Sequence, residues 1–373
     1  MKRLLTILII SLITVQCKKP FDPPVAEVDQ SVLVVEGTIA VGKKIENIFI
    51  LSKLKTLQDK SLRIPEKNAR VYIESSNGTT WNLPESGNGL YKSVLDLPET
   101  GSYKLMITTA GGKNYESAVE KAVNTPPIDS VTWKQEIDLQ LYVHTRDPAN
   151  ATRYYKWEFI ETFERHSWYQ SLLDFVDGKV VNRPLGDQIH FCWTNDTSKS
   201  ILINNTLSLD EDIVSYQPIQ KILQPSDKLS VRYSILVRQL GLTKEAYNFW
   251  NILKKNTELT GTLFDPQPSK MPSNIICTND NSRVAVGYIS VGKVTEKRLF
   301  IMNSAMNLWP SPNEEDLCPS ISDRPAKSIE FIKQNPSYVP AYFETLSGNL
   351  VIARKNCVDC RIEKGSNIKP VFW

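Results

Sequence analysis

Short runs of alternating apolar and polar residues recur along most of the chain, and they constrain its fold more than any other feature. The longest run spans residues 228–239 and places Leu229, Val231, Tyr233, Ile235 and Val237 on one face. A second run, residues 153–163, places Tyr155, Trp157, Phe159 and Glu161 together. Alternation with a period of two is typical of a strand with one buried face. The aromatic side chains favour packing within a sheet over a sugar or ligand platform, because aromatic residues are common in strands.

The first third of the chain holds further strand-like segments bounded by turn residues. They lie at residues 32–37, 48–52, 69–74, 79–83, 89–91 and 102–108. Asn77-Gly78 is a hairpin turn signal between two of them. Pro126-Pro127 suits a linker better than a central strand. Residues 30–124 are therefore predicted to form an N-terminal β-sandwich of immunoglobulin-like size.

Residues 128–373 are predicted to form a second β-rich, sandwich-like domain. Its pattern changes period once, at residues 244–258, where apolar side chains follow three- and four-residue steps after the N-cap residue Thr243. We expect one amphipathic helix there, with Phe249, Trp250 and Leu253 facing the sheet. Residues 285–302 read as a hairpin. Long loops are expected at residues 167–205, apart from a strand at 200–203, and at residues 303–337. The predicted fold class is therefore mainly β with one helix.

The N-terminus carries a short basic start, Lys2-Arg3, and an uncharged, mostly apolar run from Leu4 to Val15. That run is too short to span a bilayer, which takes about 20 apolar residues, and it fits the apolar core of a secretory signal. Cys17 follows directly, which is typical of a bacterial lipoprotein signal. We therefore expect a signal peptide over residues 1–16, lipidation at Cys17, and a proline-containing tether over residues 17–29.

The charge balance argues against nucleic acid as a partner. The chain has 44 basic and 41 acidic residues among 373. Without Lys2 and Arg3, 42 basic residues face 41 acidic ones, so the mature chain carries a formal charge of +1. A phosphate-binding face needs a clear excess of lysine and arginine. No other long apolar run follows the signal, so membrane attachment is expected through the lipid on Cys17.

Five cysteines remain after Cys17, namely Cys192, Cys277, Cys318, Cys357 and Cys360. An exported chain resides where disulfides persist, so all five are candidates for structural disulfides. Because five is odd, one thiol is expected to be free or paired elsewhere. The pair Cys357-Val-Asp-Cys360 leaves a redox or zinc site open as an alternative, although the sequence has no second CxxC motif and no nearby histidine pair.

The sequence resembles the Bacteroidota outer-membrane lipoproteins known only as "domain of unknown function 4249". The resemblance covers essentially the whole mature chain and rests on Cys17 with Pro20-Phe21, residues 33–39, 126–131, 154–157, 161–162, 233–239, 249–250, 254–256, 264–268, 274–275, 286–288 and 297–298, Cys357 to Cys360, Gly365 and residues 369–373. It implies an outer-membrane lipoprotein, often encoded beside TonB-dependent transporters. It carries over no functional residue.

Two further features concern the envelope. Lys18 and Lys19 follow the lipid cysteine. Surface-exposed lipoproteins of these bacteria often carry acidic residues at this place. The sequence therefore does not decide whether the chain lies on the periplasmic or the outer face of the membrane. Asp129-Ser130-Val131 matches the O-glycosylation sequon of this phylum, which makes Ser130 a candidate for modification. The alternative is a solvated residue between domains, since glycans belong on exposed segments.

The sequence contains no motif that names a reaction. It lacks a GxSxG nucleophile elbow, a Walker loop, a GxGxxG loop and an HExxH pattern. Its three histidines, His144, His166 and His190, are isolated, so we expect no metal and no cofactor. The acidic runs 210–212 and 314–316 could bind a hard cation, but solvated loops are the simpler interpretation. A carboxylate pair for glycoside hydrolysis is defined in space and stays open.

Three hypotheses follow. The leading one is a non-catalytic, lipid-anchored binding or accessory protein of the outer membrane that docks on a TonB-dependent transporter. The second is an envelope hydrolase acting on glycans or peptides, which would need a pocket with convergent titratable groups. The third is a structural or adhesive surface lipoprotein.

Overall fold

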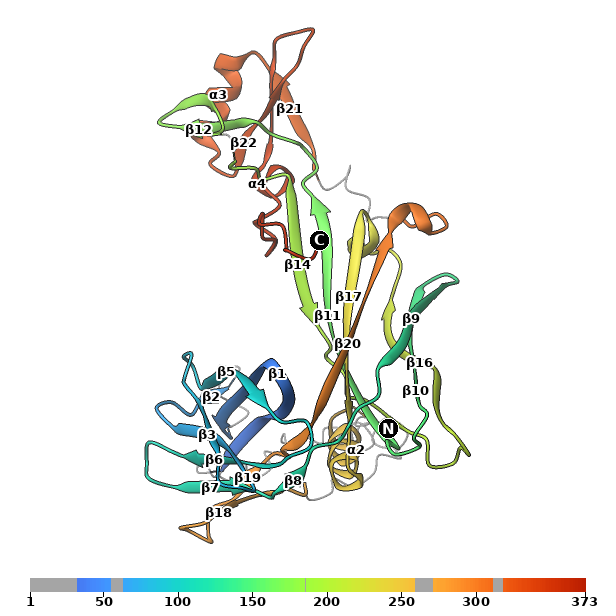
Figure 1. The fold of residues 1–373 in the computed structure, drawn as a ribbon. Helices are drawn as coiled ribbons and strands as arrows, with labels where there is room; N and C mark the ends of the chain where they lie inside the picture. The colour runs from blue at the N-terminus through green and yellow to red at the C-terminus, as the bar shows by residue number, and fades with distance from the viewer. Residues whose placement is uncertain (1–31, 55–62, 185, 259–270, 311–317) are drawn as a thin grey trace, which may run out of the picture.

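The computed structural model describes residues 32–54, 63–184, 186–258, 271–310 and 318–373. The fold is mainly β, as the alternating runs predict. Figure 1 shows an elongated molecule with three parts, which we call the N-terminal unit, the central sandwich and the distal lobe. The signal peptide, Cys17 and the tether lie outside the described residues.

The N-terminal unit consists of two layers of strands around one apolar core. Its strands are β1 (Leu33–Lys53), β2 (Ile64–Pro65), β3 (Arg70–Ser75), β4 (Thr80–Leu83), β5 (Leu90–Leu97), β6 (Ser102–Thr108), β7 (Asn114–Ser117), β8 (Glu120–Lys121), β18 (Ile275–Cys277) and β19 (Ala285–Val286). One layer is built on β1, and the other has the order β18-β7-β6-β3-β4. Phe49, Leu51, Ile73 and Leu105 are fully buried between them, which explains the alternation in the sequence.

The predicted boundary at residue 124 is wrong in one respect, because a late segment completes the N-terminal unit. β18 pairs with β7, and β19 pairs in parallel with the start of β1. Ile275 and Ile289 join the same core cluster as Phe49. The predicted hairpin over residues 285–302 is also wrong. Its two halves bond to distant strands instead of to each other, because the partners were already in place earlier in the chain.

The central sandwich packs a small sheet onto a long one. The long sheet contains β11 (Tyr154–His166), β14 (Phe191–Thr197), β15 (Leu202–Asn205), β17 (Arg232–Gly241) and β20 (Ser290–Met302), and the small one contains β9 (Ile128–Gln135), β10 (Leu139–Asp147) and β16 (Asp212–Ile222). The 3-10 turns η1 (Asp227–Leu229) and η2 (Asn303–Ala305) flank β17 and β20. The predicted faces are confirmed: Tyr155, Trp157 and Phe159 of β11 and Tyr233, Ile235 and Val237 of β17 are buried in one cluster.

The predicted helix is present as α2 (Lys244–Glu258). The Thr243 hydroxyl accepts a hydrogen bond from the backbone N–H of Ala246 at 3.2 Å, as an N-cap should. Phe249 is buried against Tyr288 and Leu240 at the edge of the long sheet. The helix therefore covers the face of this sheet that does not meet the small sheet.

The distal lobe is the part that the sequence analysis did not foresee. It contains β12 (Leu173–Val176), β13 (Lys179–Asn182), β21 (Ser320–Asp323), α3 (Pro325–Gln334), β22 (Tyr338–Phe343), β23 (Leu350–Arg354) and the short α4 (Lys355–Val358). Residues 303–337 were expected to be loops, but α3 forms there and buries Ile332 against Leu173, Leu350 and Ile352. Residues 167–205 were likewise expected to be a surface excursion apart from a strand at 200–203, which is present as β15 (Leu202–Asn205); the rest of the segment supplies β12 and β13 to the lobe and β14 to the long sheet.

One disulfide fastens the base of the lobe to the long sheet, and a second lies within the lobe. Cys192 in β14 pairs with Cys360, and Cys318 just before β21 pairs with Cys357 in α4. The two cysteines of the CxxC motif therefore bond to different partners, which excludes a disulfide between them in this structure. Cys277 is free and buried in the N-terminal unit, where its Sγ lies 3.4 Å from Oδ1 of Asn279. Expected disulfides are thus present, and one thiol is left over.

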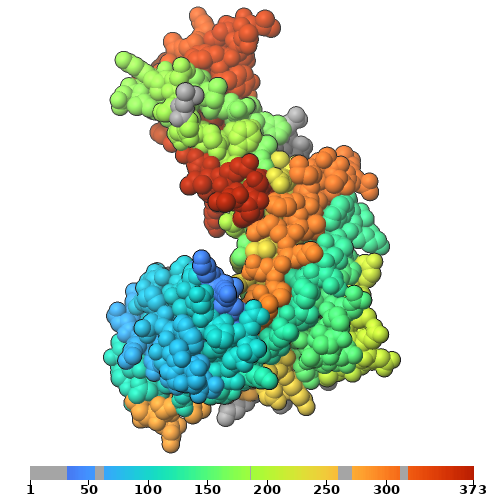
Figure 2. Space-filling model, in the orientation of Figure 1, coloured from blue at the N-terminus to red at the C-terminus, as the bar shows by residue number. Residues whose placement is uncertain are grey.

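The C-terminal residues lie along the neck between the lobe and the central sandwich, coloured dark red in Figure 2. Phe372 stacks on the Arg298 guanidinium at 3.6 Å, and Trp373 lies 5.0 Å from that of Arg232. The indole N–H of Trp373 donates to Glu164 at 3.0 Å. Cation–π contacts of this kind add roughly 0.5–2 kcal/mol each, so the tail helps to fix the lobe on the sheet.

We predict that replacing both Cys318 and Cys357 by alanine loosens the lobe without unfolding the rest of the molecule. Removing a native disulfide costs about 2–5 kcal/mol, and this one closes the loop that contains the whole of α3. Hydrogen exchange should accelerate in residues 320–354 and stay slow in β17. Cys277→Ala is the matched control, and equal acceleration in that variant would contradict the assignment.

Candidate functional site

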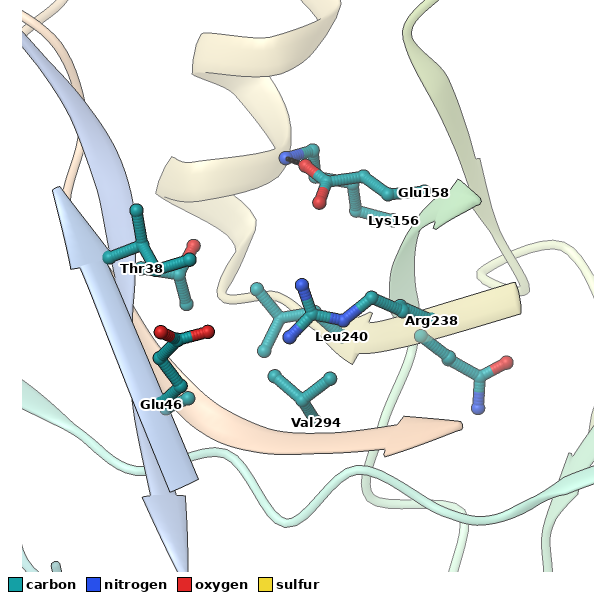
Figure 3. Close-up of a pocket in the computed structure, with 10 residues that line it drawn as sticks. Thr38, Glu46, Lys156, Glu158, Arg238, Leu240 and Val294 are labelled. Carbon is teal, nitrogen blue, oxygen red and sulfur yellow. Dashed lines mark hydrogen bonds and ion pairs between the residues drawn. The ribbon is translucent and has the colours of Figure 1, made fainter. Parts of the chain in front are cut away.

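One small pocket lies where the N-terminal unit meets the central sandwich, and Figure 3 shows it in close-up. It has a volume of about 80 Å³. Its lining residues are Thr38, Ala40, Glu46 and Ile48 of β1, Lys156 and Glu158 of β11, Arg238, Gln239 and Leu240 of β17, and Val294 of β20. Leu240 and Val294 lie at its centre, with Glu46 and Arg238 around them and Lys156 and Glu158 at its edge (Figure 3). We call it the interdomain pocket.

The charged side chains of the interdomain pocket are already paired. Lys156 Nζ lies 2.5 Å from Glu158 Oε1 and 3.7 Å above the Trp250 ring of α2. Burial alone would raise the pKa of Glu158, but the charge and hydrogen bond of Lys156 outweigh it and hold this pKa below its ordinary value.

The other two charges of the interdomain pocket have partners of the opposite sign just outside it. Arg238 Nε lies 2.9 Å from Glu296, and Glu46 lies 3.1 Å from Lys92. Ion pairs that satisfy both members support a structural role, because they need no ligand to offset the cost of desolvation. The interdomain pocket is therefore a polar joint between the two parts.

A larger pocket lies at the neck, between the end of β11 and the base of the distal lobe. It has a volume of about 390 Å³, within the range of roughly 300–1,000 Å³ that is usual for small-molecule sites. Its lining residues are Arg165, His166, Ser167, Trp168, Asp227, Cys318, Arg354, Asn356, Cys360 and Glu363. We call it the neck pocket.

The neck pocket brings together an aromatic ring, carboxylates and arginines. Arg165 Nε lies 2.9 Å from Asp227 Oδ2, and another nitrogen of its guanidinium pairs with Glu363. The Arg354 side chain is exposed and makes no hydrogen bond or ion pair with any residue in the described ranges. Trp168 keeps 41% of its surface exposed. One guanidinium and one indole are thus free to meet a ligand.

Two of the three histidines meet beside the neck pocket. The rings of His166 and His190 lie 5.1 Å apart. His166 Nε2 is 2.8 Å from Glu164, and His190 Nδ1 is 2.9 Å from the Ser167 hydroxyl. Burial lowers the pKa of His190 below its ordinary value, so its neutral form is favoured. Within the described part of the chain, no cluster of three or more His, Cys, Asp or Glu side chains could hold a metal ion.

The third histidine, His144, lies in β10 and shares a hydrogen bond with Thr132 at 2.8 Å. Burial lowers the pKa of His144 below its ordinary value. The glycosylation candidate Ser130 is in the adjacent strand β9 and is half-buried, directly opposite His144. These two residues therefore lie on the small sheet, away from the neck pocket.

The acidic run 210–212 differs from the solvated loop that we expected. Asp212 is buried, accepts hydrogen bonds from Tyr155 at 2.9 Å and from Thr206 at 2.7 Å, and begins β16. It therefore fixes one end of the small sheet to the long one. The second acidic run, 314–316, lies outside the described residues.

A buried carboxylate network near the neck was not foreseen from the sequence. Glu161 is only 1% exposed; the Lys228 ammonium donates to it at 2.6 Å and the Tyr233 hydroxyl at 2.6 Å. Lys228 also reaches Asp196 at 3.2 Å. The sequence did contain a signal, because Glu161 shares the face of Tyr155, Trp157 and Phe159. A carboxylate on an aromatic face has to find a cation or donors in the core.

The pKa values of this network favour the paired state. Burial opposes the charged form of Lys228, but Glu161 and Asp196 outweigh it and raise its pKa. Burial raises the pKa of Tyr233 well above its ordinary value, and the neighbouring Glu161 adds to the effect. At neutral pH Lys228 is therefore charged and Tyr233 is a hydrogen-bond donor. Their hydrogen bonds to Glu161 hold β11, β17 and η1 together.

The fold and the two pockets described above define a multi-part, mainly β protein with a structural joint and an open polar pocket at the neck. Among the described residues, no helix has both the length and the apolar character to cross a membrane. The chain belongs to the family described as "Domain of unknown function (DUF4249)", whose model matches residues 18–298. The resemblance to this family is thereby confirmed over residues 18–298.

Comparison with other known proteins adds little. No curated protein matches the chain. A Corynebacterium diphtheriae protein described as membrane anchored is similar at 8% identity and a TM-score of 0.17, covering 56% of this chain and 55% of that one. A chitinase from Bacillus thuringiensis is similar at 10% identity and a TM-score of 0.14, covering 46% and 28%. The chain thus spans about half and about a quarter of these two proteins.

We predict that Lys228→Met destabilises the central sandwich by about 3 kcal/mol, because it leaves the buried Glu161 without its cation. The value is at the low end for a buried pair, since the Lys228 side chain keeps 21% exposure. Urea unfolding followed by tryptophan fluorescence measures it. Lys134→Met is the matched control, because its pair with Glu136 is exposed and its loss should leave the midpoint unchanged. Equal midpoints for the two variants would contradict the prediction.

Proposed function

We propose that this protein is a lipid-anchored accessory protein of the bacterial outer membrane, which binds a partner and performs no reaction. The observation that carries the proposal is Cys17, placed directly after an apolar run of signal-peptide length. Residues 18–32 then lead to β1, the first described strand. Acylation at Cys17 would tether the folded part to the membrane, with a reach of at most about 55 Å for an extended chain.

The architecture supports a role in binding. The N-terminal unit lies beside the lower part of the central sandwich, and the distal lobe extends from the opposite end of the long sheet (Figure 1). The Cys192–Cys360 disulfide and the aromatic tail fix this lobe on the sheet. A rigid, elongated molecule presents separate surfaces that are already ordered, so binding loses little conformational entropy. Disulfides suit the oxidising compartment outside the cytoplasm. In the interdomain pocket each charged side chain already has an ion-pair partner, inside the pocket or just outside it. This arrangement fits a joint better than a reaction centre.

The partner that we propose is a TonB-dependent outer-membrane transporter. The proposal rests on the family to which the chain belongs and on the expectation that its members are encoded beside such transporters. A near-neutral mature chain leaves protein–protein contacts to shape and apolar surface instead of to a strong charge field. The face of the membrane on which the contact occurs is left open.

The first test concerns the anchor. In the native host, metabolic labelling with an alkyne palmitate should tag the wild-type protein and leave Cys17→Ala unlabelled, and the variant should leave the membrane fraction. Cys277→Ala is the matched control, since its thiol is buried in the N-terminal unit, and it should be labelled like the wild type. An unlabelled wild-type protein would overturn the proposal.

The second test concerns the partner. A photo-crosslinking residue is placed at Val94 of the N-terminal unit, Ile137 of the central sandwich and Leu346 of the distal lobe, all of which are exposed. We expect at least one of these positions to capture an outer-membrane barrel in living cells, because together they sample all three parts. The same position in the Cys17→Ala background should lose the product. If none of the positions captures a barrel, the transporter is not the partner.

A further inference from the structure

We propose that the neck pocket binds a sugar unit that carries one carboxylate, such as a uronic or sialic acid. This site goes beyond the accessory role proposed above and does not depend on it. The pocket lies between the end of β11, the turn η1 and the base of the distal lobe, and its volume is about 390 Å³. Three features of its lining carry the inference, namely its charges, its aromatic ring and its rigidity.

The charges select a ligand with a single negative group. Arg165 is paired with Asp227 and Glu363, whereas Arg354 lacks a partner among the described residues. The pocket therefore offers one free guanidinium, which pairs with a carboxylate through two parallel hydrogen bonds. A phosphate dianion fits less well, because Asp227 and Glu363 line the same pocket and would repel its second charge.

The remaining polar groups select a ligand with several hydroxyls. Each oxygen of Asp227 and Glu363 can accept more hydrogen bonds than the contacts to Arg165 use. The side chain of Asn356 offers both a donor and an acceptor on the same wall. Sugar hydroxyls can donate to the carboxylates and accept from the amide. An acidic peptide would bring carboxylates toward Asp227 and Glu363 and offer few hydroxyls in return.

The ring of Trp168 provides the apolar surface that a sugar also needs. It keeps 41% of its area exposed while it lines the pocket. A pyranose ring has an apolar face of C–H groups, which can pack on an indole while its hydroxyls point to the polar walls. A purely polar pocket would compete poorly with water for such a ligand, so the indole supplies the contact from which water is excluded.

The walls of the pocket are held in place covalently. Cys318 and Cys360 line the pocket. The bond from Cys360 to Cys192 ties its wall to β14, and the bond from Cys318 to Cys357 ties the segment before β21 to α4. The backbone N–H of Tyr169 donates to the carbonyl of Cys357 at 3.0 Å, which fixes the chain after Trp168 against α4. Binding therefore needs little ordering of the protein, and pre-organisation of this kind favours affinity.

Isothermal titration calorimetry on the full-length protein in a non-glycosidic detergent tests the proposal. The probes are glucuronic acid, galacturonic acid and N-acetylneuraminic acid, with glucose, galactose and hexaglutamate as comparisons. We expect at least one acidic sugar to bind with a Kd of about 1 mM or tighter. Glucose, galactose and hexaglutamate should each bind at least tenfold more weakly. Equal binding of neutral sugars, tighter binding of hexaglutamate, or no binding of any acidic sugar would overturn it.

Variants locate the site. Arg354→Gln and Trp168→Ala should each weaken binding of the best acidic sugar at least tenfold. Arg354→Gln should also remove the preference for the acidic over the neutral sugar. Arg324→Gln is the matched control, because this exposed arginine lies in the same lobe outside the pocket, and its binding should equal the wild type. Thermal melts check that each variant is folded. Unchanged binding in Arg354→Gln with an intact melt would place the sugar elsewhere.

Discussion

The architecture depends on how β20 bonds to its neighbours. Its first residues, Ser290–Lys293, pair in parallel with Thr38–Val41 of β1, and its remaining residues pair antiparallel with β17. The order β14-β11-β17-β20-β1-β19 is therefore one continuous sheet that runs from the central sandwich into the N-terminal unit. The backbone of Val123 also bonds to Val291 and Lys293 at 3.0 Å each, beside the same crossing. Because these bonds belong to both parts, the two cannot move independently without breaking a sheet.

Close backbone approach at this crossing explains two glycines. A Cβ on Gly292 would lie 3.0 Å from Leu240 and 3.1 Å from the carbonyl oxygen of Val123, and one on Gly241 would lie 2.8 Å from Thr152 and Val123. Larger residues would separate the strands. The interdomain pocket lies beside this crossing, which is why its ion pairs act as a joint. The neck pocket belongs to the other end of the long sheet, where the Cys192–Cys360 disulfide and the aromatic tail fix the distal lobe.

Periodicity in the sequence predicts local structure well and long-range pairing poorly. The buried faces of β11 and β17 and the helix α2 with its Thr243 cap follow from spacing alone. The prediction of a hairpin at residues 285–302 was wrong because these strands pair with strands that are distant in the sequence. Nothing near residue 285 indicates pairing with β1 or β17. Helix α3 was missed because Pro325 and the polar residues around Ile329 and Ile332 resemble a loop until the lobe supplies a surface to bury them.

The pockets were beyond the reach of sequence for a similar reason. Arg165 and Trp168 lie far along the chain from Arg354 and Glu363, and only the fold brings them together. The number of cysteines indicates how many disulfides can form but not how the cysteines pair. Spacing in the sequence cannot show that Cys357 and Cys360 form disulfides with different partners. Glu161 did leave a signal that the sequence analysis missed, because its place among aromatic residues indicates a buried carboxylate, but only the fold shows that Lys228 is its cation.

The most direct test of the shared sheet is hydrogen exchange on Gly292→Val, with mass spectrometry of peptides around Phe49 in β1 and Ile235 in β17. The side chain added at the crossing meets Leu240 and Val123, so both peptides should lose protection together while the disulfide-bonded lobe keeps its own. Loss of protection in only one of the two peptides would show that the N-terminal unit and the central sandwich are independent bodies and would contradict the account.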